Sequence, residues 1–329
     1  MAIGAFAAAA VISLGTSWVL VTRLERLGER LGFSEALLGL LAALAADTPE
    51  ITSAVTALVR HQRAVGSGVV IGSNVFNLAA LLGLGAVVAG GIGLHRKVVA
   101  LGGAVALWTA LVCLVSVAGL LPAGPALALV LAVLVPYVVL LAVNHAAITH
   151  LRLPPRWSTW LVSAVVEEES ELTVAVRPRP GTWPDAVVAG VGLVVIVGSS
   201  VVMERAGSTV GRDHRIAGIV VGGLVLAAVT SLPNAVAGVY LATRGRGAAM
   251  LSTTLSSNTF NVVLGLLLPA TVVGLARPSG PETLIVVWYA ALTMLVLVFA
   301  YVDRGLRRTK GWIVIAGYLG FVVSLLVVS

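Results

Sequence analysis

Long apolar runs constrain the fold of this chain more than any other feature of its sequence. Val98 to Leu121, Pro125 to Val143 and Thr283 to Val302 are almost continuously apolar. A helix needs about 20 such residues to cross about 30 Å of hydrocarbon. A membrane-spanning strand needs only about ten residues of alternating polarity, so a β-barrel fits poorly. With 59% hydrophobic and 11% charged residues, the chain is predicted to be an all-α polytopic membrane protein.

Charged, proline and glycine clusters divide these runs into about ten predicted transmembrane helices. Most of the 21 lysines and arginines fall in the odd-numbered loops between them. Basic residues concentrate on the cytoplasmic side of membrane proteins, so we expect a multi-pass protein of the cell membrane with both termini outside the cytoplasm. The net charge of +7 is then explained by the bilayer and not by nucleic acid. The predicted spans are 3–22, 35–59, 64–91, 98–119, 124–147, 185–203, 216–243, 247–275, 283–302 and 311–328.

An internal repeat appears when the second half of the sequence is laid over the first without gaps. The segment Ala45–Glu50 then falls on Val229–Asn234, and at the same offset Gly72–Asn77 falls on Ser256–Asn261. Five spans per half is an odd number, so the second half is expected to lie in the membrane the opposite way up, as in many secondary transporters. We therefore predict two inverted five-helix repeats with a linker on the cytoplasmic side. The boundaries are 1–149 for the first repeat, 150–184 for the linker and 185–329 for the second repeat.

The second predicted span carries two carboxylates in its middle, Asp47 and Glu50, three residues apart and so on one helix face. Pro49 removes a backbone hydrogen bond there and leaves a carbonyl without its donor. Carboxylate and carbonyl oxygens suit Ca²⁺ or Na⁺. The alternative is a structural kink with a protonated or hydrogen-bonded acid. We expect no other acid deep in a span.

Three further spans carry polar side chains that would be costly in lipid without a partner or a function. They are predicted to complete a cation site with the two acids, although hydrogen bonding between packed helices is an alternative for the third span. The only cysteine, Cys113, lies in an apolar run and gives no metal or redox motif. The predicted ligands are Asp47, Glu50, Ser73, Asn74, Asn77, Thr230, Ser231, Asn234, Ser257, Asn258 and Asn261.

At these motifs the sequence resembles the cation/Ca²⁺ exchanger superfamily, which includes sodium/calcium exchangers. Its two alpha-repeats read Gly-Thr-Ser-x-Pro-Glu on one helix and Gly-Ser-Asn-x-Phe-Asn (or Asp) on the next. The resemblance covers the segment around these motifs in each half, and ten helices in a five-plus-five inverted arrangement agree with the rest of the chain. It implies an antiporter that exports Ca²⁺ against Na⁺ or H⁺ by alternating access. It also implies that one divalent site and several Na⁺ sites are formed by Asp47, Glu50, Ser73, Asn77, Thr230, Ser231, Asn234, Ser257 and Asn261.

Two departures from the family pattern concern charge. The acid of the second repeat is replaced by Asn234, and the Thr-Ser pair of the first repeat is Ala46-Asp47. One carboxylate is lost and one gained, so both now stand in the first half. Two neighbouring carboxylates repel, and a site in which one keeps its proton would favour Na⁺, Li⁺ or H⁺ over Ca²⁺.

The leading prediction is therefore a secondary active cation antiporter that exports Ca²⁺ in exchange for Na⁺ or H⁺. A monovalent Na⁺/H⁺ antiporter is the alternative, and a non-transporting scaffold or sensor is another. The sequence holds no histidine-rich or nucleophile constellation, which argues against an enzyme. No cofactor is expected, and the partners are the lipid bilayer and inorganic cations. The oligomeric state stays open, a monomer included.

Overall fold

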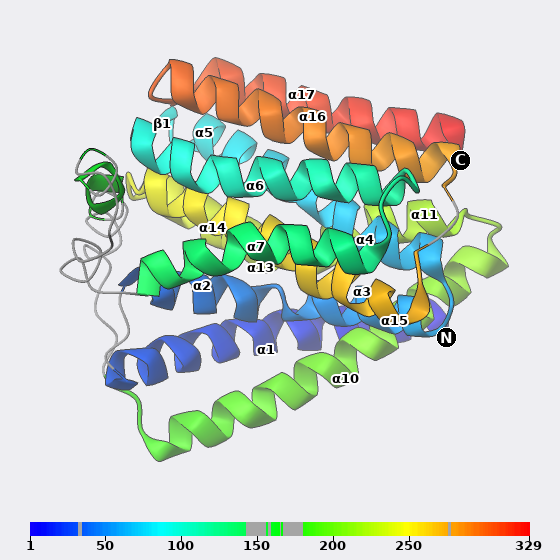
Figure 1. The fold of residues 1–329 in the computed structure, drawn as a ribbon. Helices are drawn as coiled ribbons and strands as arrows, with labels where there is room; N and C mark the ends of the chain where they lie inside the picture. Colours follow the sequence, from blue (N-terminus) through cyan, green and yellow to red (C-terminus); the bar gives the residue numbers. More distant parts are fainter. Residues whose placement is uncertain (32–34, 143–155, 157–158, 165, 167–179, 276–277) are drawn as a thin grey trace.

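Helices make up nearly all of the described chain, which forms an elongated bundle (Figure 1). The computed structural model describes residues 1–31, 35–142, 156, 159–164, 166, 180–275 and 278–329. In the first half the elements are α1 (Ala2–Leu31), α2 (Glu35–Ala46), α3 (Thr48–Val59), α4 (Arg63–Asn77), the π-helical η1 (Leu78–Gly83), α5 (Leu84–Val88), strand β1 (Gly91–Gly93), α6 (Arg96–Val117) and α7 (Ala123–Ala142).

The second half has the same succession of spans, but with one additional π-helical segment and with its strand after the fourth span instead of before it. Its elements are α10 (Trp183–Asp213), α11 (Gly218–Val220), η2 (Val221–Leu226), α12 (Ala227–Thr230), α13 (Leu232–Thr243), α14 (Gly247–Phe260), η3 (Asn261–Leu267), α15 (Leu268–Val273), α16 (Gly280–Val302), β2 (Gly305–Arg307) and α17 (Arg308–Val328). The two halves are joined at one end by the antiparallel pair β1–β2, in which Ile92 lies opposite Leu306.

The span count agrees with the sequence prediction. Within the described residues, eight helices are long and apolar enough to cross a membrane, and a pair bent by 49°, Gly218–Thr230 with Leu232–Thr243, makes nine. The remaining predicted span, 35–59, is present as the two 12-residue helices α2 and α3. Both termini lie at the same end of the bundle, as an even number of spans requires (Figure 1).

The repeat is visible in the backbone. The predicted spans 35–59 and 216–243 are each broken, at Asp47 and at Ser231, which are equivalent positions of the two repeats. A π-helical segment begins directly after Asn77 in the first half and at Asn261 in the second. π-helical turns often occur at functional sites. The domain boundaries stay a prediction, and most of the predicted linker 150–184 lies outside the described residues.

The predicted ends of two spans were wrong. The first span was expected to stop at residue 22 and the sixth at 203, but α1 continues to Leu31 and α10 to Asp213. Apolar runs mark where the hydrocarbon ends, whereas a helix continues through charged residues that have partners or water. Arg23 and Arg26 in α1 both pair with Asp185 in α10, at 2.6 and 3.4 Å.

The longer α10 includes a further acid beyond the predicted end of the sixth span. Glu204 lies in the last third of α10, and it is 0% exposed. Its carboxylate accepts hydrogen bonds from Arg60 at 3.2 Å and from Ser208 at 2.8 Å. Glu204 is therefore a fully buried carboxylate outside the predicted cation site, where Asp185 and Glu282 are also buried.

Close packing between α4 and η2 depends on glycine. A Cβ atom built on Gly72 would lie 2.2 Å from the carbonyl oxygen of Gly223, and one on Gly222 would lie 2.2 Å from that of Val65. No residue with a side chain fits at such distances without a backbone shift. These glycines bring the third and seventh spans, which come from different halves, into direct backbone contact.

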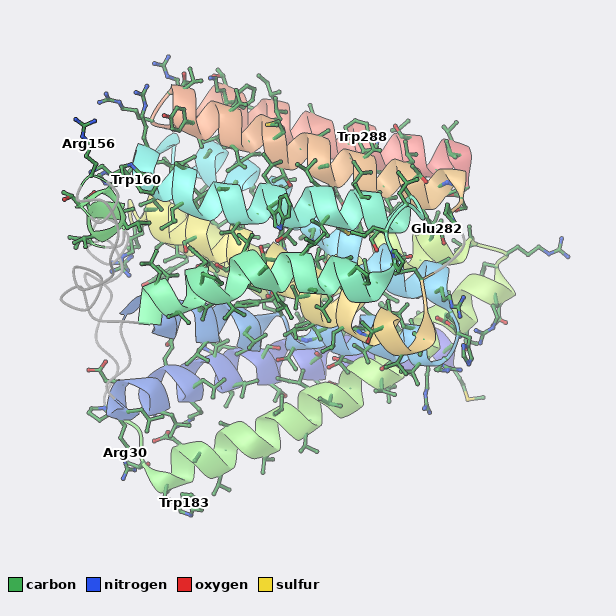
Figure 2. The ribbon with its side chains drawn as sticks, in the orientation of Figure 1. Arg30, Arg156, Trp160, Trp183, Glu282 and Trp288 are labelled. Atoms are coloured by element: carbon green, nitrogen blue, oxygen red, sulfur yellow. The ribbon has the colours of Figure 1, made fainter. Side chains whose placement is uncertain are left out.

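Two tryptophan and two arginine side chains lie at one end of the bundle. Figure 2 shows Arg30 and Trp183 at one end, with Arg156 and Trp160, and Glu282 at the opposite end. Trp183, at the start of α10, is 76% exposed. Aromatic and basic side chains at helix ends suit the headgroup region of a bilayer.

Candidate functional site

Proline places both helix breaks in the middle of the bundle. Pro49 and Pro233 stand in the first turns of α3 and α13, directly after the breaks. Neither can donate a backbone hydrogen bond to the residue four positions earlier, so the carbonyl groups of Ala45 and Val229 lose their usual helical donors. Each break also gives the following helix a free N-terminus, whose partial positive charge stabilises nearby negative groups.

The two acids of the first half are held by polar side chains of the second half. Asp47 Oδ1 accepts hydrogen bonds from Asn234 Nδ2 at 2.8 Å and from Ser257 Oγ at 2.6 Å. Glu50 accepts from Ser231 and Asn261, and also from Asn234 at 3.4 Å. All four of these donor side chains belong to the second half of the chain.

The repeat makes part of this network symmetric. When the halves are superposed in sequence, the bond from Ser231 to Glu50 corresponds to the bond from Asn234 to Asp47. The network is thus centred between the two halves, and the difference between them is chemical: the first half contributes two acceptors, whereas the second contributes a hydroxyl and an amide.

Two asparagines form a reciprocal clamp between α4 and α14. Asn74 Nδ2 donates to the carbonyl oxygen of Asn258 at 3.0 Å, and Asn258 Nδ2 donates to that of Asn74 at 3.1 Å. Asn77 Nδ2 donates to Asn258 Oδ1 at 3.2 Å and to Ser257 Oγ at 3.3 Å. Asn261 Nδ2 reaches Asn74 Oδ1 at 3.3 Å. The amides therefore connect the carboxylates to the backbone of both helices.

Two predicted ligands do not join this network. Ser73 Oγ donates to the carbonyl oxygen of Val69 at 2.6 Å, and Thr230 Oγ1 donates to that of Leu226 at 2.9 Å. Both hydroxyls bond within their own helices, although their lone pairs stay available to a cation. The structure therefore links nine of the eleven predicted residues by side-chain hydrogen bonds, and all eleven are at most 1% exposed.

Three buried oxygen atoms in the network accept no hydrogen bond. They are Asp47 Oδ2, Asn77 Oδ1 and Asn261 Oδ1. Buried polar atoms are nearly always satisfied, because an unpaired group of this kind costs about 1–3 kcal/mol. All three are acceptors, so only a proton donor or a cation can satisfy them. This arrangement can bind a positive ion.

One residue near the site was missed by the sequence reasoning. Ser53 is fully buried on α3, one turn after Glu50, and its Oγ has no hydrogen-bond partner. Its position three residues after Glu50, on the same helix face, was a signal that could have identified it. Among the described residues no group of three or more His, Cys, Asp or Glu side chains is placed to hold a metal ion. The two acids of the network are Asp47 and Glu50.

Comparison with protein families gives a clear relationship. The family described as sodium/calcium exchanger protein matches residues 1–167 and 185–327. The chain belongs to the sodium/calcium exchanger family. This match covers most of the chain and includes every residue of the hydrogen-bonded network, and it confirms the resemblance stated from the two motifs.

Solved structures show the same fold. The chain is similar to the sodium-calcium exchanger NCX_Mj soaked with Na⁺ and Sr²⁺, with a TM-score of 0.65, 18% identity and 98% of each chain covered. It is also similar to the structure of native YfkE, with a TM-score of 0.63 and 14% identity over 98% of this chain and 92% of that one. At these identities the likeness concerns the fold alone.

Curated relatives match over a shorter stretch. Sodium/potassium/calcium exchanger 2 of Rattus norvegicus is 29% identical over 128 residues, and that of Gallus gallus is 27% identical over 128 residues. The matched segment is 36% of this chain but only 18% and 19% of those two proteins.

Proposed function

We propose that this member of the exchanger family is a secondary active antiporter that exports Ca²⁺ in exchange for Na⁺ or H⁺. The transported cation would bind at the buried network between the two halves. The observation that carries this proposal is the cluster of Asp47 and Glu50 with three buried acceptor oxygens that have no donor. The names of the similar exchangers support the same class of cargo.

The ligand set suits a hard cation. Ca²⁺ takes six to eight oxygen ligands and accepts carboxylate, amide and hydroxyl groups. The network offers two carboxylates, the side-chain oxygens of Asn77 and Asn261 and the hydroxyls of Ser231 and Ser257. Hydroxyls and amides can rotate, so donors that now point at the carboxylates can turn their oxygens toward an ion.

The placement of both carboxylates in the first half supports a monovalent cation antiporter as an alternative. Asn234 stands where the family pattern has its second acid, and it donates to both Asp47 and Glu50. If one of the two carboxylates carries a proton, the site holds a single negative charge. Such a site would select Na⁺ or H⁺ over Ca²⁺. A Na⁺/H⁺ antiporter is therefore the second candidate, and a non-transporting scaffold or sensor is the third.

The predicted topology and the inverted repeat support transport by alternating access. The odd-numbered loops are proposed to face the cytoplasm, which places both termini outside the cell. Inverted repeats that meet at a midplane site allow the two halves to exchange conformations, so that the site opens to each side in turn. The two spans are broken at Asp47 and Ser231, and we propose that these breaks are where the backbone changes during such an exchange.

Ion flux in proteoliposomes tests this proposal. Vesicles loaded with radiolabelled Ca²⁺ would be diluted into buffers that give an inward Na⁺ gradient, an inward H⁺ gradient or neither. We expect efflux that follows one gradient, is abolished by Glu50→Gln and is reduced by Asp47→Ser. The matched control is Glu282→Gln, because Glu282 is also largely buried but lies at the start of α16 and bonds to Ser279.

The outcomes separate the candidate functions. Efflux that responds to a gradient in the wild type and in the Glu282→Gln control, but not in Glu50→Gln, supports a Ca²⁺ antiporter. Vesicles that move no Ca²⁺ but still exchange Na⁺ for H⁺ would favour the monovalent alternative. Vesicles that move none of these ions would favour a scaffold or sensor.

A further inference from the structure

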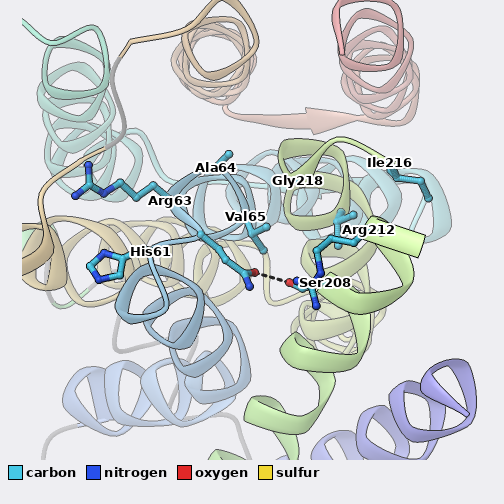
Figure 3. A pocket seen from close by; sticks show the side chains of 11 residues that line it. His61, Arg63, Ala64, Val65, Ser208, Arg212, Ile216 and Gly218 are labelled. Atoms are coloured by element: carbon cyan, nitrogen blue, oxygen red, sulfur yellow. Dashed lines mark hydrogen bonds between the residues drawn. The ribbon is translucent and has the colours of Figure 1, made fainter. Parts of the chain in front are cut away.

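An ion pair with one fully buried partner ties the helix that carries the acids to α10. Arg60, directly after α3, donates to the carboxylate of Glu204 at 3.2 Å. Next to it, Ser208 Oγ lies 2.7 Å from the side-chain oxygen of Gln62, within hydrogen-bond distance. The glutamate side chain is 0% exposed, whereas the arginine side chain is 36% exposed. These groups lie beside a cavity of about 440 Å³, whose lining includes Gln62, Ser208 and Arg212, and Figure 3 marks the bond at Ser208.

These contacts are unusual for α10. Its other side-chain hydrogen bonds to another helix, within the described residues, all go to α1, through Ser200 to Ser13 and through Asp185 to Arg23 and Arg26. The helices α1 and α10 thus form a pair that is bonded internally. In the part of the chain that the structure describes, only the bonds to Arg60 and Gln62 join side chains of α10 to the remaining helices.

The position of α3 relative to α10 depends on side-chain contacts of this kind. Because the chain is broken at Asp47, α3 is a separate helix of 12 residues and not the rigid continuation of α2. Asp47 and Glu50 stand at its beginning, and Arg60 follows its end. With a rise of 1.5 Å per residue, the ion pair acts about 15 Å from Glu50, at the other end of the same short helix.

The repeat does not reproduce this ion pair. At the offset that superposes the two motifs, Arg60 falls on Arg244 and Glu204 falls on Leu20. Arg244 is exposed and its guanidinium lies over the ring of Tyr240, while Leu20 is buried in an apolar cluster. The two equivalent helix pairs also pack differently. In one, α10 packs closely against α3, whereas in the other α1 packs only slightly against α13. An inverted repeat can adopt two arrangements, in which the halves exchange roles. The ion pair is therefore available only in the arrangement seen here.

We propose that Glu204 and Arg60 are positioning residues for the cation site. Their ion pair fixes α3, and with it Asp47 and Glu50, against α10, and it favours the arrangement seen here over the one in which the halves exchange roles. This inference rests on the proposed function. A ligand or contact shifts such an equilibrium only by its differential interaction with the two states. Loss of the pair should change the balance by about fivefold or more.

Distance measurement between spin labels tests the inference without relying on transport. Labels would be attached to cysteines at Val59 in α3 and Val202 in α10, which are 58% and 45% exposed. The native Cys113 is buried and would not react. The variants are Glu204→Gln and Arg60→Gln. The matched control is Asp185→Asn, which removes an ion pair of α10 that stays within the α1–α10 pair.

We expect one dominant distance in the labelled wild type and in Asp185→Asn. Glu204→Gln and Arg60→Gln should each populate a second distance and shift the apparent KM for Ca²⁺ more than the maximal rate of efflux. Arg60 is partly exposed, so its variant should fold even if Glu204→Gln does not. Unchanged distances in Arg60→Gln, or an equal change in Asp185→Asn, would overturn the inference. If the wild type moves no ion while the two variants still show the second distance, the proposed function is refuted and the positioning role of the ion pair stands.

Discussion

The glycine contact between α4 and η2 gives a prediction whose size follows from the structure. In Gly72→Ala the new Cβ would lie 2.2 Å from the carbonyl oxygen of Gly223 and 2.5 Å from its Cα. Cβ atoms essentially never approach other heavy atoms closer than 3.0 Å, so the two backbones must move apart. Neither atom belongs to a flexible side chain that could turn away.

Overpacking of this kind costs about 1–3 kcal/mol, occasionally more. The higher helix propensity of alanine offsets up to about 1 kcal/mol of that. Both clashing atoms are backbone, so the cost should lie near the upper end of that range, and we expect Gly72→Ala to lose about 2 kcal/mol of unfolding free energy, measured by denaturant unfolding in detergent micelles. Its neighbour Ser73 should move as well, so cation binding should weaken.

A control separates the clash from the loss of glycine. Gly198 lies inside α10, and a Cβ there would meet nothing within 4 Å. Gly198→Ala should therefore stabilise the protein by about 0.5–1 kcal/mol. Equal stability of Gly72→Ala and wild type would refute the close backbone contact of α4 with η2.

Three other predictions concern single polar groups. Asn234→Asp adds a carboxylate to the site, and we expect Ca²⁺ to bind about tenfold more tightly in equilibrium binding, because affinity rises with ligand charge; unchanged affinity would place Asn234 outside the site. Asn74→Ala removes the side-chain donor to the carbonyl of Asn258, which keeps only the backbone N–H of Asn261, and should cost about 0.5–1.5 kcal/mol in unfolding free energy, which a stability equal to wild type would contradict. The hydrogen bond from Lys310 lowers the pKa of Asp303, so the folded pKa lies below the unfolded one. The pair then stabilises the fold above the ordinary Asp pKa, and the stability difference between wild type and Asp303→Asn should shrink as the pH falls below about 4, whereas a difference that grows in acid would contradict this.

Much of the fold could be predicted because lipid imposes a simple rule on sequence. Helices in a bilayer must satisfy their own backbone and present apolar side chains for about 20 residues. The ends of α1 and α10 could not be found in this way, since Arg23 and Glu204 are charged residues inside continuous helices. The burial of Glu204 was missed for the same reason. This residue directly follows an apolar run, and only the fold shows that it is buried and paired with Arg60.

The site residues were identifiable for a different reason. Buried polar residues in a span are costly, and a repeat at a fixed offset marks the same positions twice. Sequence could not show which side chains bond across the halves, nor that Ser73 and Thr230 bond within their own helices. Those outcomes depend on side-chain rotation and helix packing, which no spacing in the sequence encodes.

Equilibrium binding of radiolabelled Ca²⁺ to the purified protein asks whether the buried network is what holds the cation. We predict saturable binding that is lost in Glu50→Gln, weakened in Asp47→Asn and kept in Glu282→Gln, and that Na⁺ or H⁺ displaces. Saturable Ca²⁺ binding that survives both Glu50→Gln and Asp47→Asn would contradict this prediction, since the cation would then be held elsewhere in the protein.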